Sequence, residues 1–323
     1  MPRFIPPGMG WFPDLPDPRD YTPDHKEVRR LLARLKSDKS GQKSVPASVD
    51  LRGEDDAPSA FFSAVADQQT LNCSAVCAVL GLVEYFERRV RGRAFEGSIL
   101  CLYKMARKLR RTSGDCGVDL RTTLKSLRRF GAVPYDLWYT DAERFDDVAE
   151  DASLICAGFA LAYQDACYVR LDARGLAYFA KSSKQNVPVP LADDNLCHSL
   201  GSQTLRNVKS FLAAGFPVAF GFSVPKSLST ESRILYRPTF DSIRGGQAVL
   251  AVGYDDEKDT SPKGAILIRN SWGETWGDAG YGWLPYAYIE RQFATDCWTL
   301  LKKDWIDPGE LSLPSVLVPE ISV

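Results

Sequence analysis

The chain has 323 residues, 45% of them apolar, which allows a large hydrophobic core and exceeds one average domain. Its 40 basic and 41 acidic side chains leave a formal net charge of −1, so no overall field favours nucleic acid or an anionic membrane. No apolar run approaches the roughly 18 residues of a membrane span, and the first eight residues lack the pattern of a signal peptide. We therefore expect a cytoplasmic protein with no nucleic-acid or membrane partner.

The cysteines predict neither a disulfide framework nor a metal site. There are eight of them, but because a signal peptide is missing we expect mostly buried thiols. Cys73 and Cys77 have a CxxxC spacing without a second such pair or a nearby histidine pair, so we predict no zinc and no cofactor. The chain has only two histidines, His25 and His198.

Residues 1–44 are predicted to form an N-terminal arm, similar to a propeptide or an extension. Residues 1–22 are rich in proline and aspartate, which favours extended or turn-like backbone. Residues 24–36 carry apolar side chains at helical spacing and predict a short amphipathic helix. The polar residues 37–44 then indicate a linker.

A helical half follows the arm. Residues 73–91 predict the longest helix, for which Asn72 or Ser74 could be the N-cap. Further helices are predicted over residues 99–110 and 120–130, and Gly131 suits the end of the last one.

The second half of the chain has the pattern of strands. Residues 217–223, 248–254 and 265–269 are apolar runs between turns, whereas the polar stretch 174–203 predicts an inserted loop. A helical half before a β-rich half predicts an α+β fold of two lobes with a cleft between them. The expected boundaries are a domain over 45–300, with a helical lobe at about 66–170 and a β-rich lobe at about 45–65 and 205–300, and a C-terminal tail over 301–323.

Three motifs carry a family resemblance. They are Val45-Pro-Ala-Ser-Val-Asp-Leu-Arg52, Gly245-Gly-Gln-Ala-Val-Leu-Ala-Val-Gly-Tyr254, and a block from Asn270 to Tyr281 that reads NSWGxxWGxxGY. Over roughly residues 45–300 the chain resembles the papain-like (C1) cysteine peptidase family. Gly10 to Tyr21 is similar to the N-terminal signature of the bacterial branch of that family. The resemblance implies a papain-like fold with the active site in the cleft between its lobes.

The resemblance also implies the site residues. Gln68 matches the glutamine that builds the oxyanion hole, and Asn270 matches the asparagine that orients the catalytic histidine. Ser74 stands where the family has its nucleophilic cysteine, and Gln247 stands where the family has histidine. The implied binding cleft has Cys73, Cys116, Gly117, Gly246 and Trp272 along it.

These two replacements remove the proton chemistry of a cysteine peptidase. In such an enzyme an imidazole stabilises the thiolate and then protonates the leaving amine. A serine hydroxyl is a much weaker acid than a thiol, whose pKa is about 8.5, and a glutamine amide cannot take up a proton near neutral pH. The resemblance thus predicts a degenerate active site, a pseudopeptidase that binds a peptide or partner protein without cutting it.

Several alternatives stay open at the level of sequence. Cys73 is the nucleophile if the register shifts by one residue, and His25 or His198 would have to replace the base from outside the family position. Gln68 could simply bond backbone, and Trp272 and Trp276 could be core residues. A repurposed enzyme that uses Ser74 or Cys73 for acyl transfer, and a scaffold whose cleft is irrelevant, are the competing functions. The cleft is a candidate location for the arm, as in the propeptides of related peptidases.

Overall fold

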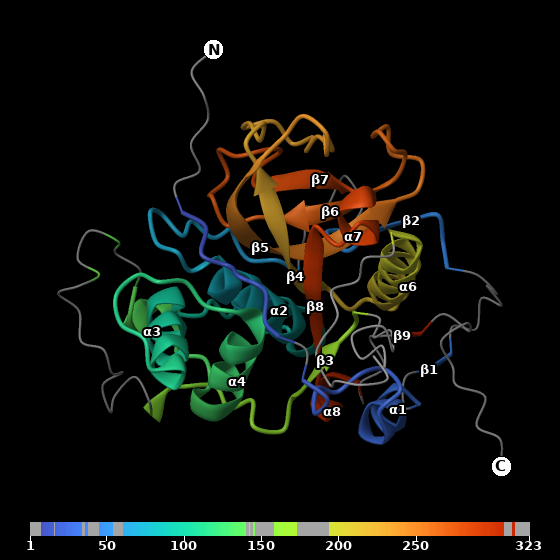
Figure 1. Cartoon of the computed structure of the whole chain (residues 1–323). Coiled ribbons are helices and arrows are strands. Elements are labelled where there is room, and N and C mark those ends of the chain that lie inside the picture. The colour runs from blue at the N-terminus through green and yellow to red at the C-terminus, as the bar shows by residue number, and fades with distance from the viewer. Residues whose placement is uncertain are drawn as a thin grey trace, which may run out of the picture.

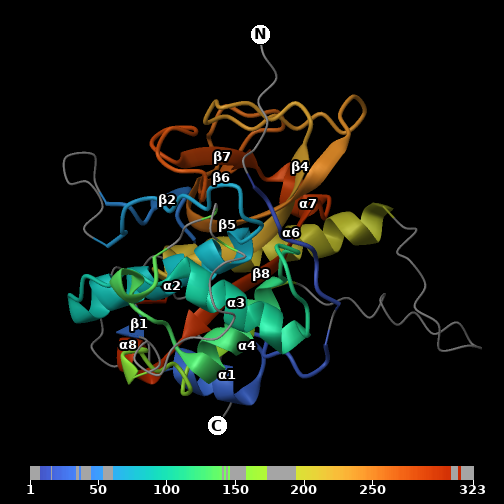
Figure 2. The same ribbon diagram turned by 90° about the vertical axis from the view of Figure 1, so that its left-hand side faces the viewer.

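The computed structural model describes residues 8–15, 17–33, 36–37, 45–53, 61–139, 142, 145, 158–172, 194–306 and 312–313. Helices and strands separate into two lobes, with α2, α3 and α4 on one side and the strands β5, β6 and β7 on the other (Figure 1). The same separation is visible after a quarter turn (Figure 2). The described part of the chain contains no helix that is long and apolar enough to cross a bilayer.

The helical lobe is built around α2 (Ser74–Arg91), which is buried continuously from Ser74 to Glu87. It packs against α3 (Ile99–Arg110), α4 (Leu120–Phe130) and the strands β4 and β5. The Ser98 hydroxyl caps α3 and the Asp119 carboxylate caps α4 by accepting the bonds of backbone amides that lack a helical partner. The three predicted helices are therefore confirmed within one residue at each end.

The N-terminus of α2 differs from the prediction. Its N-cap residue is Cys73, which makes no side-chain capping bond. The Ser74 amide instead donates to the Met9 carbonyl at 3.2 Å, so a distant segment satisfies a free amide of the helix. Asn72 does not cap because its side-chain amide donates to the Asp115 carboxylate at 3.0 Å.

The second lobe is an antiparallel sheet with strand order β3-β8-β4-β5-β6-β7, in which β2 also pairs with β5. Helices next to a large antiparallel sheet confirm the α+β class. The predicted strands are present, and β5 begins five residues earlier than expected, so that Gly245, Gly246 and Gln247 are paired with β4. The strands are β2 (Ser48–Asp50), β3 (Cys167–Arg170), β4 (Val218–Pro225), β5 (Ile243–Asp255), β6 (Ala265–Arg269), β7 (Tyr281–Pro285) and β8 (Ala294–Leu301).

The smaller elements lie at the edges of these two lobes. The N-terminal helix α1 is shorter than predicted, and β1 pairs in parallel with β9. Their bounds are α1 (Lys26–Leu32), β1 (Lys36–Ser37), the 3₁₀ helix η1 (Tyr135–Leu137), α7 (Ala287–Glu290), α8 (Lys303–Ile306) and β9 (Ser312–Leu313).

One expectation is wrong in part. The predicted loop over 174–203 is helical from Asp194 onward, because α6 spans Asp194–Ala213. Leu205, Val208 and Leu212 recur at helical spacing and are buried, and the helix packs on β5 and α7. The polar first turns of this helix conceal its periodicity. Residues 174–193 of the expected loop lie outside the described residues.

A buried ion cluster, which we call the anchor cluster, holds the N-terminal arm to the rest of the fold. Four carboxylates surround two guanidinium groups there, and the members come from the arm, α4, β3 and β8. Arg170 contacts the carboxylates of Asp14 and, at 3.0 Å, Asp296, while Arg121 Nε donates to Asp20 at 2.8 Å. The full set is Asp14, Asp20, Arg121, Arg170, Asp172 and Asp296.

The anchor cluster predicts that stability falls as the pH rises. Burial is the largest of the causes that raise the pKa of Asp296 to about 8. The negative charges of Asp14 and Asp172 also raise this pKa, whereas the positive charge of Arg170 lowers it. Burial also raises the pKa of Asp14 and of Asp172. An unfolded aspartate has a pKa of about 3.9. Between about pH 4 and about pH 8, Asp296 is therefore protonated in the folded chain and ionised in the unfolded chain. The contribution of Asp296 to the free energy of unfolding is therefore full below about pH 4 and disappears towards about pH 8.

Urea unfolding at about pH 5.5 and about pH 8.5 measures this effect. The wild-type chain should be less stable at the higher pH, and the difference should shrink in an Asp296→Asn variant. An unchanged difference in the variant would show that Asp296 does not hold the proton.

Candidate active site

The predicted active-site positions come together where α2 meets β5. Gln247 lies between the two other amide side chains, and its Nε2 donates to Gln68 Oε1 and to Asn270 Oδ1, each at 2.9 Å. Gln68, Ser74 and Gln247 have no exposed surface, and Asn270 is 3% exposed. The side chain at the expected histidine position thus connects the oxyanion glutamine to the orienting asparagine in a buried network.

The Ser74 hydroxyl belongs to a separate contact. Its Oγ accepts a hydrogen bond from the backbone amide of Ala248 at 3.1 Å, which connects the first residue of α2 to β5. A backbone amide donates a proton to hydrogen bonds but does not take one up. This contact orients the hydroxyl oxygen without providing a base for it.

Cys73 is buried and is a poor nucleophile in this setting. Its side chain has no exposed surface. A hydrogen bond with the Cys77 thiol and burial both raise the pKa of the Cys73 thiol well above its usual value. Reactive cysteines have lowered pKa values and are accessible, so Cys73 has the opposite properties.

The N-terminal arm crosses the site directly above Ser74. The Met9 carbonyl accepts from Gln68 Nε2 and from the Ser74 amide, both at 3.2 Å. Trp272 Nε1 donates to the Gly8 carbonyl at 2.8 Å. A carbonyl of the chain itself therefore occupies both the Gln68 side-chain donor, which the resemblance assigns to the oxyanion hole, and the backbone amide of Ser74.

The arm continues between the two lobes through backbone hydrogen bonds. The Val118 amide donates to the Gly10 carbonyl at 3.0 Å, and the Trp11 amide donates to the Gly246 carbonyl at 3.1 Å. We call this path of Gly8 to Phe12, between Asn72 and Val118 on one side and β5 on the other, the arm track. In Figure 1 the dark blue N-terminal ribbon follows it across the front of α2.

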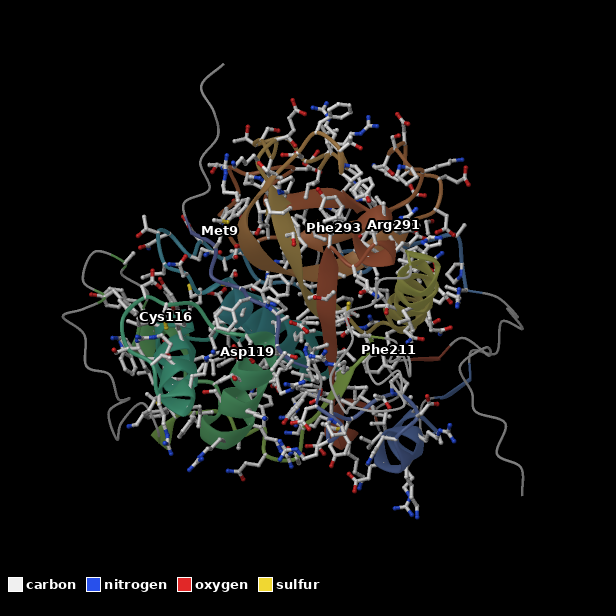
Figure 3. All side chains as sticks on the ribbon, in the orientation of Figure 1. Met9, Cys116, Asp119, Phe211, Arg291 and Phe293 are labelled. Carbon is white, nitrogen blue, oxygen red and sulfur yellow. The ribbon has the colours of Figure 1, made fainter. Side chains whose placement is uncertain are left out.

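Four of the five residues predicted to lie along the cleft belong to this region. Gly117 and Gly246 contact the arm, Trp272 binds it through the indole N–H, and Cys73 precedes the helix end that the arm caps. Cys116 differs because it is exposed. Figure 3 labels Met9 on the arm and Cys116 on the helical lobe.

Sequence reasoning missed several contacts of the site. Ser271 Oγ donates to Gln68 Oε1 at 2.6 Å and completes the amide network. Asp115 accepts bonds from the Asn72 amide at 2.9 Å and from the Tyr103 hydroxyl at 2.7 Å, which fixes the turn before α2. Asn72 Oδ1 in turn accepts from the Met9 amide at 3.3 Å. Both Asn72 and Asp115 are polar residues close to predicted helix starts. This pattern is the sequence signal that could have indicated their hydrogen bonds.

Neither histidine has the environment of a replacement base. His25 caps α1, where its Nδ1 accepts from the Glu27 amide at 3.3 Å. His198 is exposed on α6, whereas Ser74 is fully buried. Trp272 and Trp276 are both buried core residues in edge-to-face contact, with ring centroids 5.5 Å apart. Trp272 also binds the arm, because its indole N–H donates to the Gly8 carbonyl.

Comparison with known proteins finds similarity to papain-like peptidases. Residues 164–297 match the family described as papain family cysteine protease. The chain is 27% identical, over 90% of its own length and 86% of the relative's, to an uncharacterized peptidase C1-like protein of Acanthamoeba polyphaga mimivirus.

Solved structures give the same result. Xylellain, a cysteine protease from Xylella fastidiosa, superposes with a TM-score of 0.66 at 26% identity, covering 94% of this chain and 98% of xylellain. The digestive procathepsin L 3 of Tenebrio molitor larval midgut shares the fold, with a TM-score of 0.53 at 19% identity over 85% of this chain and 78% of its own. By fold and by sequence, the chain is thus similar to the papain-like C1 peptidases.

Proposed function

We propose that this chain is a pseudopeptidase, a papain-like protein whose interlobe cleft binds a peptide or protein segment without hydrolysing it. The observation that carries the proposal is the position of Gln247. Its amide lies between Gln68 and Asn270 at 2.9 Å from each, and the family resemblance assigns an imidazole to this position in the sequence. An amide can orient its neighbours, but it cannot accept the proton that amide hydrolysis moves from nucleophile to leaving group.

The surroundings of Ser74 support the same conclusion. An alkoxide at Ser74 would need a base or a strong positive field, and a helix N-terminus supplies only about 0.3 to 1 kcal/mol, less than one pKa unit. The backbone amide of Ala248 satisfies the oxygen but removes no proton. Oxyanion donors and binding alone would leave about 10³ to 10⁴ of acceleration over water, which is negligible for a peptidase.

The position of the arm supports a binding role for the cleft. The arm binds the site through its carbonyls and amides, with Gly8, Met9, Gly10 and Trp11 each making a backbone hydrogen bond. A cleft that holds an extended segment of its own chain has the donors and acceptors to hold another such segment. The alternative use of Cys73 in acyl transfer gains no support, because that thiol is buried with a raised pKa.

Incubation of the purified full chain with a broad peptide library and a thiol-directed covalent peptidase inhibitor tests the proposal. We expect no cleavage above background, and intact mass should show no adduct on Ser74 or Cys73. An active papain-like peptidase treated in parallel is the positive control. Efficient cleavage of the peptides, or stoichiometric labelling of Ser74 or Cys73, would contradict the proposal.

The absence of self-processing is a second expectation. Because the proposed site cannot hydrolyse a peptide bond, the arm should stay covalently attached, and the intact mass should be unchanged after long storage. Loss of an N-terminal fragment from a preparation free of other peptidases would contradict this. A bacterial origin of the family branch and a cytoplasmic location stay predictions from the sequence.

A further inference from the structure

The arm track is so narrow at one point that neither side admits a side chain. Gly10 has φ +99°, and a Cβ on it would lie 2.0 Å from the Asn72 carbonyl oxygen. In the same wall of the track, a Cβ on Gly117, whose φ is +77°, would lie 2.3 Å from the Gly10 carbonyl oxygen. Real Cβ atoms do not approach backbone oxygens so closely, so a bound segment needs glycine at this position.

The next position has the opposite requirement. The Trp11 indole covers Gly221, where a Cβ would lie 1.8 Å from the indole Cε2, and a Cβ on Gly246 would lie 2.3 Å from the Trp11 carbonyl oxygen. Gly221 pairs with Ala248 and Gly246 pairs with Ser223, so both glycines lie on the same face of the neighbouring strands β4 and β5. Two adjacent glycines leave a depression that the indole fills, and Trp11 is only 7% exposed.

The hydrogen bonds of the arm involve its backbone, whereas Gly8 is a second position without room for a side chain, because a Cβ on it would lie 2.4 Å from the Leu71 carbonyl oxygen. Met9, Gly10 and Trp11 use backbone carbonyls and amides for their hydrogen bonds to Gln68, Val118 and Gly246. Main-chain bonds of this kind supply affinity for any extended segment, while side-chain fit supplies selectivity. Selectivity in the arm track therefore depends on the glycine positions Gly8 and Gly10 and on the indole position that follows Gly10.

We infer that the cleft is a recognition site for an extended segment of a partner protein that contains a Gly-Trp pair, and that Gly117, Gly221 and Gly246 determine this specificity. The inference rests on the proposed function and gives the cleft a ligand class. The arm of this chain carries the same pair at Gly10 and Trp11 and occupies the site in cis. A tethered segment has an effective concentration of the order of mM, so a free ligand binds only where it outcompetes the arm or where the arm is displaced.

The test uses the full chain with a Trp11→Ala substitution, which weakens the arm but leaves the walls of the track unchanged. A fluorescent octapeptide with the sequence of residues 8–15, GMGWFPDL, is titrated into this variant and into the wild-type chain. We expect saturable binding to the variant and binding at least about tenfold weaker to the wild type, whose own arm competes. Peptides with alanine in place of the third-position glycine, or of the tryptophan, should each bind about tenfold or more weakly than the parent.

A wall variant provides the matched control. Adding Gly221→Val to the Trp11→Ala chain fills the depression, so this double variant should lose the peptide although its arm is equally weakened. Hydrogen exchange at residues 8–12 shows directly whether the arm is displaced, and circular dichroism shows that each variant is folded. If the Trp11→Ala chain does not fold, Gly10→Ala weakens the arm through a different residue and takes its place.

Equal binding of all three peptides, or no binding by a folded variant whose arm is displaced, would overturn the inference. A wild-type dimer that the Trp11→Ala substitution dissociates would assign the site to arms exchanged between two copies and would also overturn it. Mass spectrometry of the peptide after the titration separates this question from the proposed function. Cleaved peptide with retained Gly-Trp selectivity would refute the pseudopeptidase and leave the specificity standing.

Discussion

Replacing Arg170 with methionine is expected to lower the free energy of unfolding by about 3 to 5 kcal/mol, because the change removes one of the two guanidinium groups that neutralise the buried acidic residues of the anchor cluster. Arg170 contacts Asp14 and lies 3.0 Å from Asp296, and its guanidinium covers the Trp298 ring at 4.5 Å. Methionine keeps much of the side-chain volume, so the loss reports on charge more than on packing. Urea unfolding of the full chain at neutral pH measures it.

The matched control for Arg170 is Arg233→Met. Arg233 also pairs with a carboxylate, Asp259 at 3.6 Å, but its side chain is 48% exposed. Exposed pairs contribute little because water screens them, so this variant should unfold like the wild type. Similar losses in the two variants would mean that the anchor cluster does not hold the arm to the fold. Hydrogen exchange at residues 8–15 should also accelerate in Arg170→Met and not in the control.

Restoring the family's two proton-handling residues is expected to create thiol reactivity. In the Trp11→Ala background, where the arm is weakened, Ser74→Cys with Gln247→His should be labelled by a thiol-directed peptidase inhibitor. Labelling should be about 10² to 10⁴ times faster than in the same chain with Ser74→Cys alone. Asn270, whose Oδ1 now accepts from the Gln247 amide at 2.9 Å, is placed to accept from an imidazole N–H instead.

The variant with Ser74→Cys and the native Gln247 separates a base effect from a thiol effect. Its thiol would sit at a helix N-terminus without an imidazole, where only the helix field lowers its pKa. Equal labelling rates with and without histidine would contradict the proposal that Gln247 makes the site inactive. Mass spectrometry of the labelled protein identifies position 74 and excludes Cys73 as the modified residue.

Much of the fold follows from local sequence patterns. The helices over 99–110 and 120–130 were predictable because their apolar spacing and their caps, Ser98 and Asp119, are local features. The start of α6 was not predictable in this way, because its first turns are mostly polar and packing on β5 stabilises the helix. The cap of α2 was also not predictable from local patterns, because the group that binds the Ser74 amide comes from Met9.

The candidate site also has features that the sequence predicts and features that depend on distant contacts. The motifs fixed the register of Ser74 and Gln247, and the structure brings both to the same place with Gln68 and Asn270. The contact of Ser271 with Gln68 depends on side-chain orientation that no spacing encodes. The anchor cluster joins residues up to 282 positions apart, such as Asp14 and Asp296, so sequence proximity gives no indication of it.

In the proposed pseudopeptidase the site is chemically inactive and not merely covered by the arm. A covered but competent peptidase and a pseudopeptidase would both be silent as wild-type chains, so the informative measurement is peptide turnover by the folded Trp11→Ala variant beside the wild type. Turnover should stay at the background rate in both, even where hydrogen exchange shows that residues 8–12 have left the arm track. Cleavage that appears in the variant alone would contradict the account, since it would show a working peptidase held inactive by its own N-terminal arm.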